Sequence, residues 1–194
     1  FQEGTFIFTP QKGGRALQTK EMEITSTTLL RDVINFMADA MGIQTPPGPD
    51  PENPIKTDAS GYNPGPGVTA SGQIRFISNS GLDNAVEIDL SGLAMKTTAG
   101  VIPINLQFNT LQEPNGESVE VDFIVYDSLG ESLPVRLTAV LEDRDSNATT
   151  FRWYADSPSN ISTTDNDHIA VGTGLIRFDG KGNFVSATNS QIQI

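Results

Sequence analysis

The chain has no cysteine among its 194 residues. Disulfide bonds, thiolate nucleophiles and metal sites built from cysteine are therefore excluded within it. Histidine is almost as scarce, because His168 is the sole example. One imidazole cannot supply a histidine-based metal site, and no Gly-x-Ser-x-Gly segment is present to suggest a serine nucleophile. We interpret His168 as a surface residue and expect no metal and no cofactor.

Basic residues are also scarce. Twelve lysines and arginines stand against 24 aspartates and glutamates, which gives a formal net charge of -12, and the basic residues do not cluster. Without a basic patch to neutralise phosphates, we expect neither nucleic acid nor an anionic membrane as a partner. No apolar run reaches the length of about 18 residues that marks a membrane-spanning helix. The chain begins at Phe1 without a signal-like segment, so we expect an excised internal fragment.

Period-two alternation is the clearest pattern that is present. Apolar residues occupy every second position over 121–125 and again over 133–141. Such alternation predicts two strands with one buried face each. Between them, Asp127 and Ser128 favour a turn and Gly130 accepts a positive φ. The sequence therefore predicts a long β-hairpin, in which Asp127 and Ser128 serve the turn and are not a catalytic pair.

One helix is predicted, at about residues 28–41. Its apolar residues recur at helical spacing, and hydroxyls at Ser26, Thr27 and Thr28 are available for an N-cap. Gly42 is the expected residue just beyond the C-terminal end. Residues 45–67 follow, and their many prolines and glycines predict a loop without regular structure.

The order of elements predicts two domains and a mainly β fold. Residues 1–96 indicate a small α+β domain with the one helix and the 45–67 loop, and residues 97–194 indicate an all-β sandwich or barrel. Trp153 is the expected core anchor of the second domain. Outside the hairpin, we expect strands at 6–8, 16–25, 73–78, 85–90, 101–108, 149–155, 169–171, 175–178 and 183–186.

One acidic segment has the spacing of a known calcium-binding loop. Asp143, Asp145 and Asn147 have the first three spacings of an EF-hand loop, but Ala148 stands where glycine is needed and Tyr154 where a bidentate glutamate is needed. We therefore predict a solvated acidic turn, and the same holds for Asp165 and Asp167.

Paired glycines and glycosylation patterns complete the candidates. Gly172-Thr-Gly174 and Gly180-Lys-Gly182 open no helix and belong to no complete phosphate-binding motif, so we interpret all four as turn glycines. Asn147-Ala-Thr149 and Asn160-Ile-Ser162 match the N-glycosylation pattern, which matters only in a host that glycosylates. No catalytic, cofactor-binding or metal-binding residue is assigned, and we do not expect an enzyme.

Ordered features of the second half resemble the flagellar hook proteins of bacteria. VYDSLG at 125–130 is similar to that family's most recognisable signature, in which the turn precedes an apolar strand. TFRWYA at 150–155 is similar to its W-x-Y strand. GLIRFD at 174–179 with GNF at 182–184 resembles its G-x-L-x-F-D-x-x-G-x-L hairpin, with Phe184 in place of the usual aliphatic residue.

The resemblance covers about residues 97–194. TTAGV at 97–101, leading into INL at 104–106, resembles the first segment of the family's outer β domain. In the first half, TSTTLLRDVINFM at 25–37 resembles a helix opening found among axial flagellar proteins, and residues 1–96 are interpreted as an inserted outer domain.

The resemblance implies a structural role. Hook subunits polymerise into a short, curved, flexible tube that joins the basal-body rod to the filament, outside the cell. The implied partners are copies of the same chain in a helical tubular polymer and other flagellar axial and junction proteins. Because the family polymerises through terminal helices at the extreme ends of the full chain, we expect this fragment alone to be monomeric.

Three other functions remain open. A distal rod subunit shares these motifs but usually lacks an insert as large as residues 1–96. An extracellular β-sandwich adhesin or carbohydrate-binding module would show a row of exposed aromatic side chains, for which Trp153 and the three tyrosines are poorly spaced. An enzyme with carboxylates paired only in three dimensions is the remaining alternative.

Overall fold

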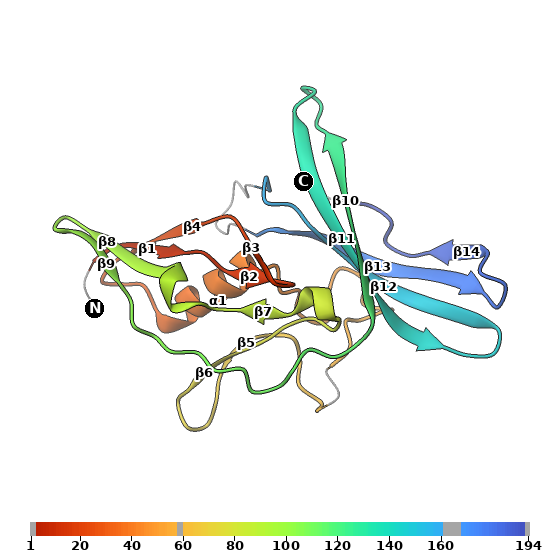
Figure 1. Cartoon of the computed structure of the whole chain (residues 1–194), viewed down its shortest axis with the longest axis horizontal. Helices are drawn as coiled ribbons and strands as arrows, with labels where there is room; N and C mark the ends of the chain where they lie inside the picture. The colour runs from red at the N-terminus through yellow and green to blue at the C-terminus, as the bar shows by residue number, and fades with distance from the viewer. Residues whose placement is uncertain (1–2, 58–59, 161–167, 193–194) are drawn as a thin grey trace.

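The computed structural model describes residues 3–57, 60–160 and 168–192. Its fold is mainly β with a single α-helix in the described residues. An N-terminal α+β region packs beside a C-terminal antiparallel sheet of five strands, which curls into a half-barrel (Figure 1). The predicted fold class is therefore confirmed. The C-terminal part is one open, curled layer of strands.

The N-terminal region is built on a four-stranded sheet. Its order is β4 (Lys20–Ile24), β1 (Gly4–Phe8), β8 (Leu93–Thr97) and β9 (Gly100–Pro103), all antiparallel. The helix α1 (Leu30–Ala40) contributes to the same apolar core as this sheet. Its large buried members include Phe6, Phe8, Ile24, Phe36, Met37, Met41 and Leu93. Strands β8 and β9 form a hairpin, so the sheet continues past residue 97 to Pro103.

Two smaller sheets extend this region. One contains β3 (Arg15–Ala16), β2 (Gln11–Lys12) and β7 (Val86–Glu87), and the other pairs β5 (Gly65–Val68) with β6 (Ile74–Ile77). The prediction that 45–67 lacks regular structure is wrong at its end, where β5 begins. Pro66 fits there because β5 pairs with β6 alone, and an edge strand tolerates a residue without an N–H.

Several predicted strands are shorter in the structure. The segment 85–90 forms only β7 before the 3-10 helix η2 (Leu90–Gly92), and another 3-10 helix, η1 (Leu82–Asn84), precedes it. The segment 101–108 is strand only as far as Pro103. Ile104 and Phe108 nevertheless pack against the N-terminal core, which explains their apolar pattern.

Helix α1 is capped differently from the prediction at its start. No hydroxyl of residues 26–28 caps it, and the N–H of Leu29 donates instead to Asp32 Oδ2 at 2.9 Å. The end agrees with the prediction, because Gly42 has φ +65°. Its N–H donates to Asp39 O at 3.0 Å, and that of Ile43 donates to Ala38 O at 3.1 Å. This pair of bonds is the Schellman arrangement that ends many helices at a glycine.

The C-terminal sheet follows the chain in order. Its strands are β10 (Ser118–Tyr126), β11 (Ser132–Arg144), β12 (Ala148–Asp156), β13 (Ala170–Asp179) and β14 (Phe184–Ala187), and each pairs antiparallel with the next. The predicted hairpin of 121–141 is confirmed as β10 and β11. Irregularities in register at 141/143, 155/156 and 177/178 break the ladders locally. Such bulges increase twist and bend a strand, which is consistent with the curled shape.

Three hairpin turns share one feature: the side-chain oxygen of the first turn residue accepts backbone N–H groups of later ones. In the turn between β10 and β11, the backbone N–H groups of Leu129 and Glu131 both donate to Asp127 Oδ1 at 2.8 Å, and Gly130 has φ +84°. The turn from Asp179 to Asn183 repeats these bonds, with Gly182 at φ +83°. Thr69 replaces the aspartate in the turn between β5 and β6, where its Oγ1 accepts the N–H of Gln73 at 3.1 Å. The predicted role of Asp127 and Gly130 is confirmed.

Trp153 anchors the core of the sheet, as predicted. Its side chain is buried with Val135, Ala155 and Val171. The prediction that Gly172 and Gly174 are turn residues is wrong, because both lie inside β13 opposite the indole. A Cβ on Gly174 would lie 2.8 Å from Trp153 Nε1, and one on Gly172 would lie 3.1 Å from its Cη2. These positions therefore favour glycine, which admits the large ring against the backbone; at Gly174 the backbone oxygen of Thr188 would lie even closer to a Cβ than the ring does. Gly180 and Gly182 do lie in a turn.

Candidate interaction surface

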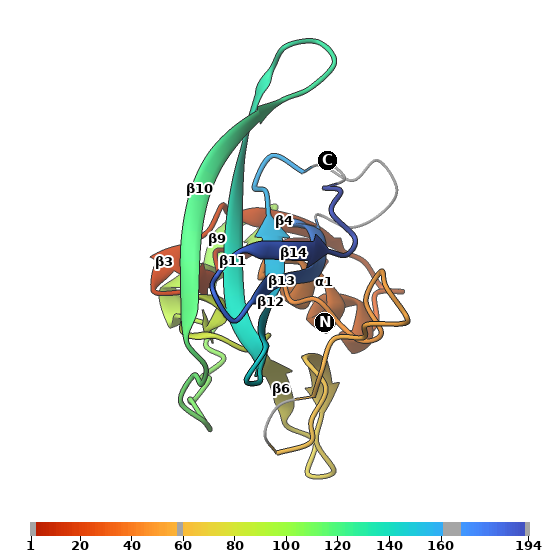
Figure 2. The ribbon, with the colours of Figure 1, turned by 90° about the vertical axis from the view of Figure 1, so that its right-hand side faces the viewer.

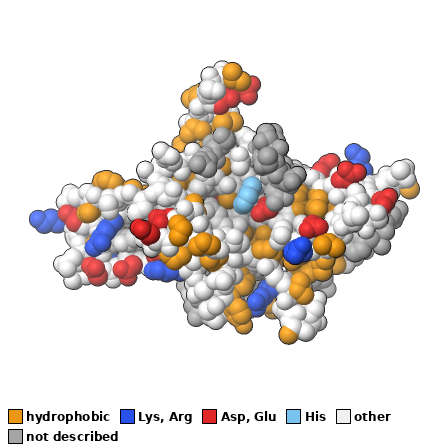
Figure 3. All heavy atoms as spheres, turned by 180° about the vertical axis from the view of Figure 1, so that it is seen from behind, with side chains coloured by type: hydrophobic (Ala, Val, Ile, Leu, Met, Phe, Trp, Pro, Cys, Tyr) orange, Lys and Arg blue, Asp and Glu red, His pale blue; other side chains and the backbone are white. Residues whose placement is uncertain are grey.

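Strands β10 and β11 project from the body of the molecule as a long hairpin (Figures 1 and 2). We call its residues 119–139 the arm. Large apolar side chains of the arm face solvent, including Leu129 with 85% of its surface exposed and Tyr126 with 71%. The others are Val119, Val121 and Ile124. Figure 3 shows apolar and acidic side chains together at the arm's end. The exposed apolar side chains lie on both faces of β10 and in the turn, so the arm offers them for a protein–protein contact on either side.

The register of the sheet gives it two chemically different faces. Pairs such as Val121 with Leu137 and Ala139 with Trp153 place apolar side chains on one face, which we call the apolar face. The pairs Asp122 with Arg136, and Thr138 with Tyr154, place polar ones on the opposite, polar face. The polar face is turned toward the N-terminal region, because every ion pair between the two parts described below uses it.

Charged side chains brace the base of the arm. Arg136 donates from Nε and Nη2 to the two carboxylate oxygens of Asp122, at 2.8 and 3.2 Å. These bonds hold the pKa of Asp122 below its ordinary value, with a smaller contribution from the nearby Arg15. Arg15, from β3, pairs with Glu120 at 2.5 Å and so links the N-terminal region to β10. The arm is therefore fixed in direction at its base.

A buried ion pair lies where the two parts meet. Lys12 Nζ on β2 is 2.6 Å from Asp156 Oδ2 at the end of β12, and the two side chains are only 6% and 7% exposed. Lys12 also donates to Gly42 O at 3.3 Å, just after the helix. Burial raises the pKa of Asp156, and the positive charge of Lys12 opposes this shift. The pair therefore links three elements that are distant in sequence: β2, the end of α1 and β12.

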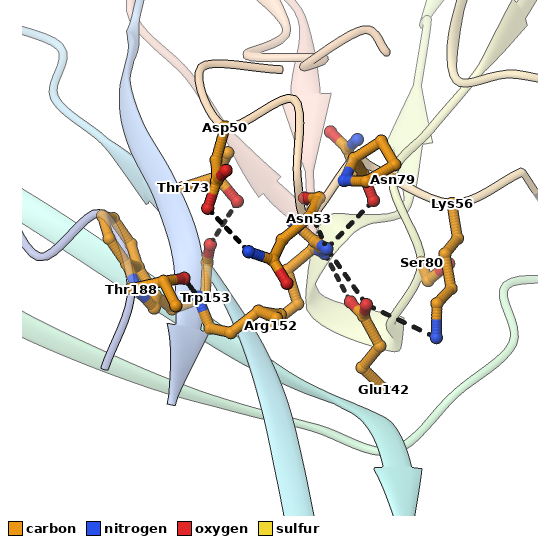
Figure 4. Close-up of polar contacts among 12 residues, drawn as sticks. Asp50, Asn53, Lys56, Asn79, Ser80, Glu142, Arg152, Trp153, Thr173 and Thr188 are labelled. Atoms are coloured by element: carbon orange, nitrogen blue, oxygen red, sulfur yellow. Dashed lines mark hydrogen bonds and ion pairs between the residues drawn. The ribbon is translucent and has the colours of Figure 1, made fainter. Parts of the chain in front are cut away.

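A second ionic cluster holds the proline-rich segment (Figure 4). Arg152 is buried on β12, and its guanidinium makes a two-pronged contact with the carboxylate of Glu142. The same group donates to the backbone oxygens of Asn53 and Pro54, at 3.1 and 3.0 Å. Lys56 approaches Glu142 to 3.4 Å from the same segment. The loop is thus fastened to the sheet, which its composition did not reveal.

Amide and hydroxyl groups complete the contact. Gln44 and Asn79 exchange two hydrogen bonds of 2.9 and 2.7 Å, and Gln44 Nε2 also donates to Gly172 O at 2.9 Å. Ser118 Oγ donates to Asp83 Oδ2 at 2.6 Å and accepts the N–H of Asp83 at 3.0 Å. We use the name joint for these groups together with Lys12–Asp156 and the Arg152 cluster. Chemically, the joint positions the arm.

His168 lies at the surface, as the sequence predicts. Its side chain is 46% exposed, and its Nε2 is 3.5 Å from Asp39 Oδ1. Burial raises the pKa of Asp39, and the neighbouring imidazole acts in the opposite direction. Within the described residues, no three His, Cys, Asp or Glu side chains are grouped so that they could hold a metal ion.

The acidic candidate at 143–147 spans the end of β11 and the turn that follows it. Asp145 Oδ1 accepts the N–H groups of Asn147 and Ala148, at 2.6 and 2.8 Å, and these bonds lower its pKa. Asp143 and Asn147 are exposed. The candidates Asp165 and Asp167 lie outside the described residues.

The two glycosylation patterns differ in their surroundings. Asn147 is exposed in the turn between β11 and β12. The Asn160 side chain donates to His168 O at 2.6 Å, so its amide is engaged, and the rest of its pattern lies outside the described residues.

Sequence reasoning missed the joint altogether. Lys12, Arg152 and Asp156 each occupy an ordinary polar position of an alternating or turn-like segment. The one available signal is that 148–156 carries polar residues yet is buried along most of its length, and burial is not visible in the sequence. Buried charges need partners, but the sequence does not say which ones.

Comparisons with known proteins do not assign the chain to a family. No protein-family model, no curated protein and no solved structure matches the chain. None of the described helices has the length and apolar character needed to cross a membrane.

Proposed function

We propose that the chain is the outer, non-polymerising part of a bacterial flagellar hook-type subunit, a structural protein whose copies assemble into a curved tube. One observation supports this most. Three of the segments that resemble the hook family fall on successive elements of one sheet: 125–130 at the tip of the arm, 150–155 on β12, and 174–184 along β13 and into β14. The segments 97–106 and 25–37 lie in the N-terminal region. A resemblance that follows one connected substructure carries more weight than scattered matches.

The surface of the molecule suits this role. The arm presents apolar side chains beyond the body, and the joint fixes its direction. Contacts of modest size with polar rims let neighbouring subunits shift against one another, as a flexible tube requires. An adhesin or carbohydrate-binding module is less well supported, because the exposed aromatic side chains of the described residues come from separate elements: Tyr62 from a loop, Tyr126 from β10 and Phe184 from β14.

Localisation tests the proposal. In cells that carry the gene, antibodies raised against the chain are expected to label the short curved segment between rod and filament in electron micrographs. Labelling confined to the filament, the rod or the general cell surface would overturn it. A glycan array with the isolated chain separates the carbohydrate-binding alternative, which predicts saturable binding to specific sugars.

Substitutions test the arm itself. In the full-length protein, Leu129→Ser removes an 85% exposed side chain at the tip of the arm, and we expect hooks with altered curvature or bending stiffness. Leu111→Ser is the matched control, since Leu111 is 83% exposed but lies outside the arm. If both variants give hooks like those of the unchanged protein, the arm is not a contact between subunits.

A further inference from the structure

The sequence contains one Asn-Gly dipeptide, at Asn115 and Gly116. Asparagine followed by glycine is the pair most prone to spontaneous deamidation, because no side chain on the second residue hinders its backbone nitrogen. Asn115 is exposed, and the pair lies just before β10. Within the described chain, the N–H of Gly116 has no hydrogen-bond acceptor. The nitrogen that must attack is therefore unengaged.

Both carbonyl groups of this pair are structural. The N–H of Gly81 donates to Asn115 O at 2.9 Å, and that of Leu82 donates to Gly116 O at 3.2 Å. Together with the Ser118–Asp83 bonds, they form a clasp that ties η1 to the base of the arm. Gly81 is tightly packed in the clasp, since a Cβ at this position would lie 2.7 Å from Val140 Cγ2.

We propose that Asn115 is a site of spontaneous modification, at which deamidation and isomerisation loosen the clasp at the base of the arm as the protein ages. The backbone nitrogen of Gly116 attacks the side-chain amide carbon of Asn115. The new C–N bond closes a five-membered succinimide, the bond from that carbon to Nδ2 breaks, and ammonia leaves with the proton of the attacking nitrogen. Water then opens the ring at either carbonyl, giving aspartate or isoaspartate.

The isoaspartate product changes the backbone. The main chain then runs through the former side-chain carbons, with one more atom between Cα of residue 115 and its new amide carbonyl, and the former backbone carbonyl of Asn115 becomes a carboxylate outside the main chain. The oxygens of residues 115 and 116 can no longer meet the N–H groups of Gly81 and Leu82 together. The product also adds a negative charge to a chain that is already at -12. This inference does not depend on the proposed assembly role.

Incubation of the whole folded chain at mildly alkaline pH tests the reaction. Peptide mapping by mass spectrometry is expected to show amide loss at Asn115 before any other asparagine, with isoaspartate detected by enzymatic methyl transfer. The same chain unfolded in denaturant and the variant Asn115→Gln are the controls. If Asn115 keeps its amide in the folded chain while the unfolded chain loses it, the clasp blocks the reaction and the proposal fails.

Hydrogen exchange tests the consequence. After incubation, the amides of Gly81 and Leu82 are expected to exchange faster than in the fresh protein, and Asn115→Gln is expected to show no such change. Asn115→Asp, measured fresh and without incubation, supplies the charge without the longer backbone, so it should leave both amides protected. Unchanged protection in chains that contain isoaspartate would overturn the loosening.

Discussion

At the scale of single residues, aspartates that accept backbone N–H groups define the turns of this protein. Asp127, Asp145 and Asp179 each use one carboxylate oxygen to satisfy two N–H groups of the following turn. Hydrogen bonds to a charged acceptor are stronger than neutral ones, and they stabilise the ionised form. Part of the acidic composition of this chain is thus a set of turn-forming groups.

Asp127→Ala is expected to destabilise the arm. It leaves the N–H groups of Leu129 and Glu131 without their acceptor, at a cost of about 1–2 kcal/mol in the free energy of unfolding. Gly130→Ala should also destabilise, by about 1 kcal/mol, because its φ of +84° disfavours a side chain. Chemical denaturation measures both effects. Ser128→Ala, at an exposed position of the same turn, is the control and should change little.

The pH dependence of stability should reveal the turn carboxylates. Hydrogen bonds from Asn183 and from backbone N–H groups hold the pKa of Asp179 below its ordinary value of 3.8. A carboxyl whose pKa is lowered in the folded state stabilises the fold at every pH above its ordinary pKa. That stabilisation is lost as the pH falls through the pKa of the folded state. Asp179→Asn should therefore be less stable than the unchanged chain at neutral pH, with the difference shrinking in acid. A constant difference in unfolding free energy across that range would contradict the assignment.

At the scale of elements, strand β13 shows how position overrides residue type. Gly172 and Gly174 are turn-forming by type, yet they sit in the middle of a strand. Their missing side chains leave room for the indole of Trp153, which lies in the neighbouring strand opposite Gly174. The role of these two glycines follows from the pairing of β12 with β13. The sequence of either strand alone does not indicate it.

Gly172→Ala should destabilise the sheet by overpacking. Its Cβ would lie 3.1 and 3.2 Å from two carbons of the Trp153 ring and 3.2 Å from Gln191 O. Such insertions into a packed core cost about 1–3 kcal/mol. In a Trp153→Leu background, which lacks the ring, the same substitution should cost less, and a double-mutant cycle in denaturant measures the difference. Equal costs in the two backgrounds would show that the ring is not the obstacle.

At the scale of the whole molecule, the joint connects the N-terminal region to the C-terminal sheet. Lys12 and Asp156 are separated by 144 positions in the sequence, and Arg152 reaches a segment about 100 positions earlier. Buried ion pairs add little net stability compared with apolar replacements, but breaking one leaves an uncompensated charge. The joint is therefore better understood as specifying how the parts fit than as a source of stability.

Lys12→Met should be severely destabilising, by about 3–5 kcal/mol, since it leaves the carboxylate of Asp156 buried without its cation. Lys12→Met combined with Asp156→Leu should restore most of this loss, because neither position then holds a buried charge. Unfolding monitored by Trp153 fluorescence measures both variants. A double variant as unstable as Lys12→Met alone would show that the pair contributes more than mutual neutralisation.

The sequence by itself determined the local features: the β10–β11 hairpin, its Asp127 and Gly130 turn, the end of α1 at Gly42, and the mainly β class. These depend on spacing and backbone preference within a few residues, so a short stretch contains all the information. Tertiary structure alone decided the open half-barrel, the glycines opposite Trp153, the anchoring of the proline-rich segment and the Lys12–Asp156 pair. Each of those depends on which distant segments pack against each other. The sequence offers many possible partners for a buried charge or a large ring, and only the folded structure brings one of them into contact.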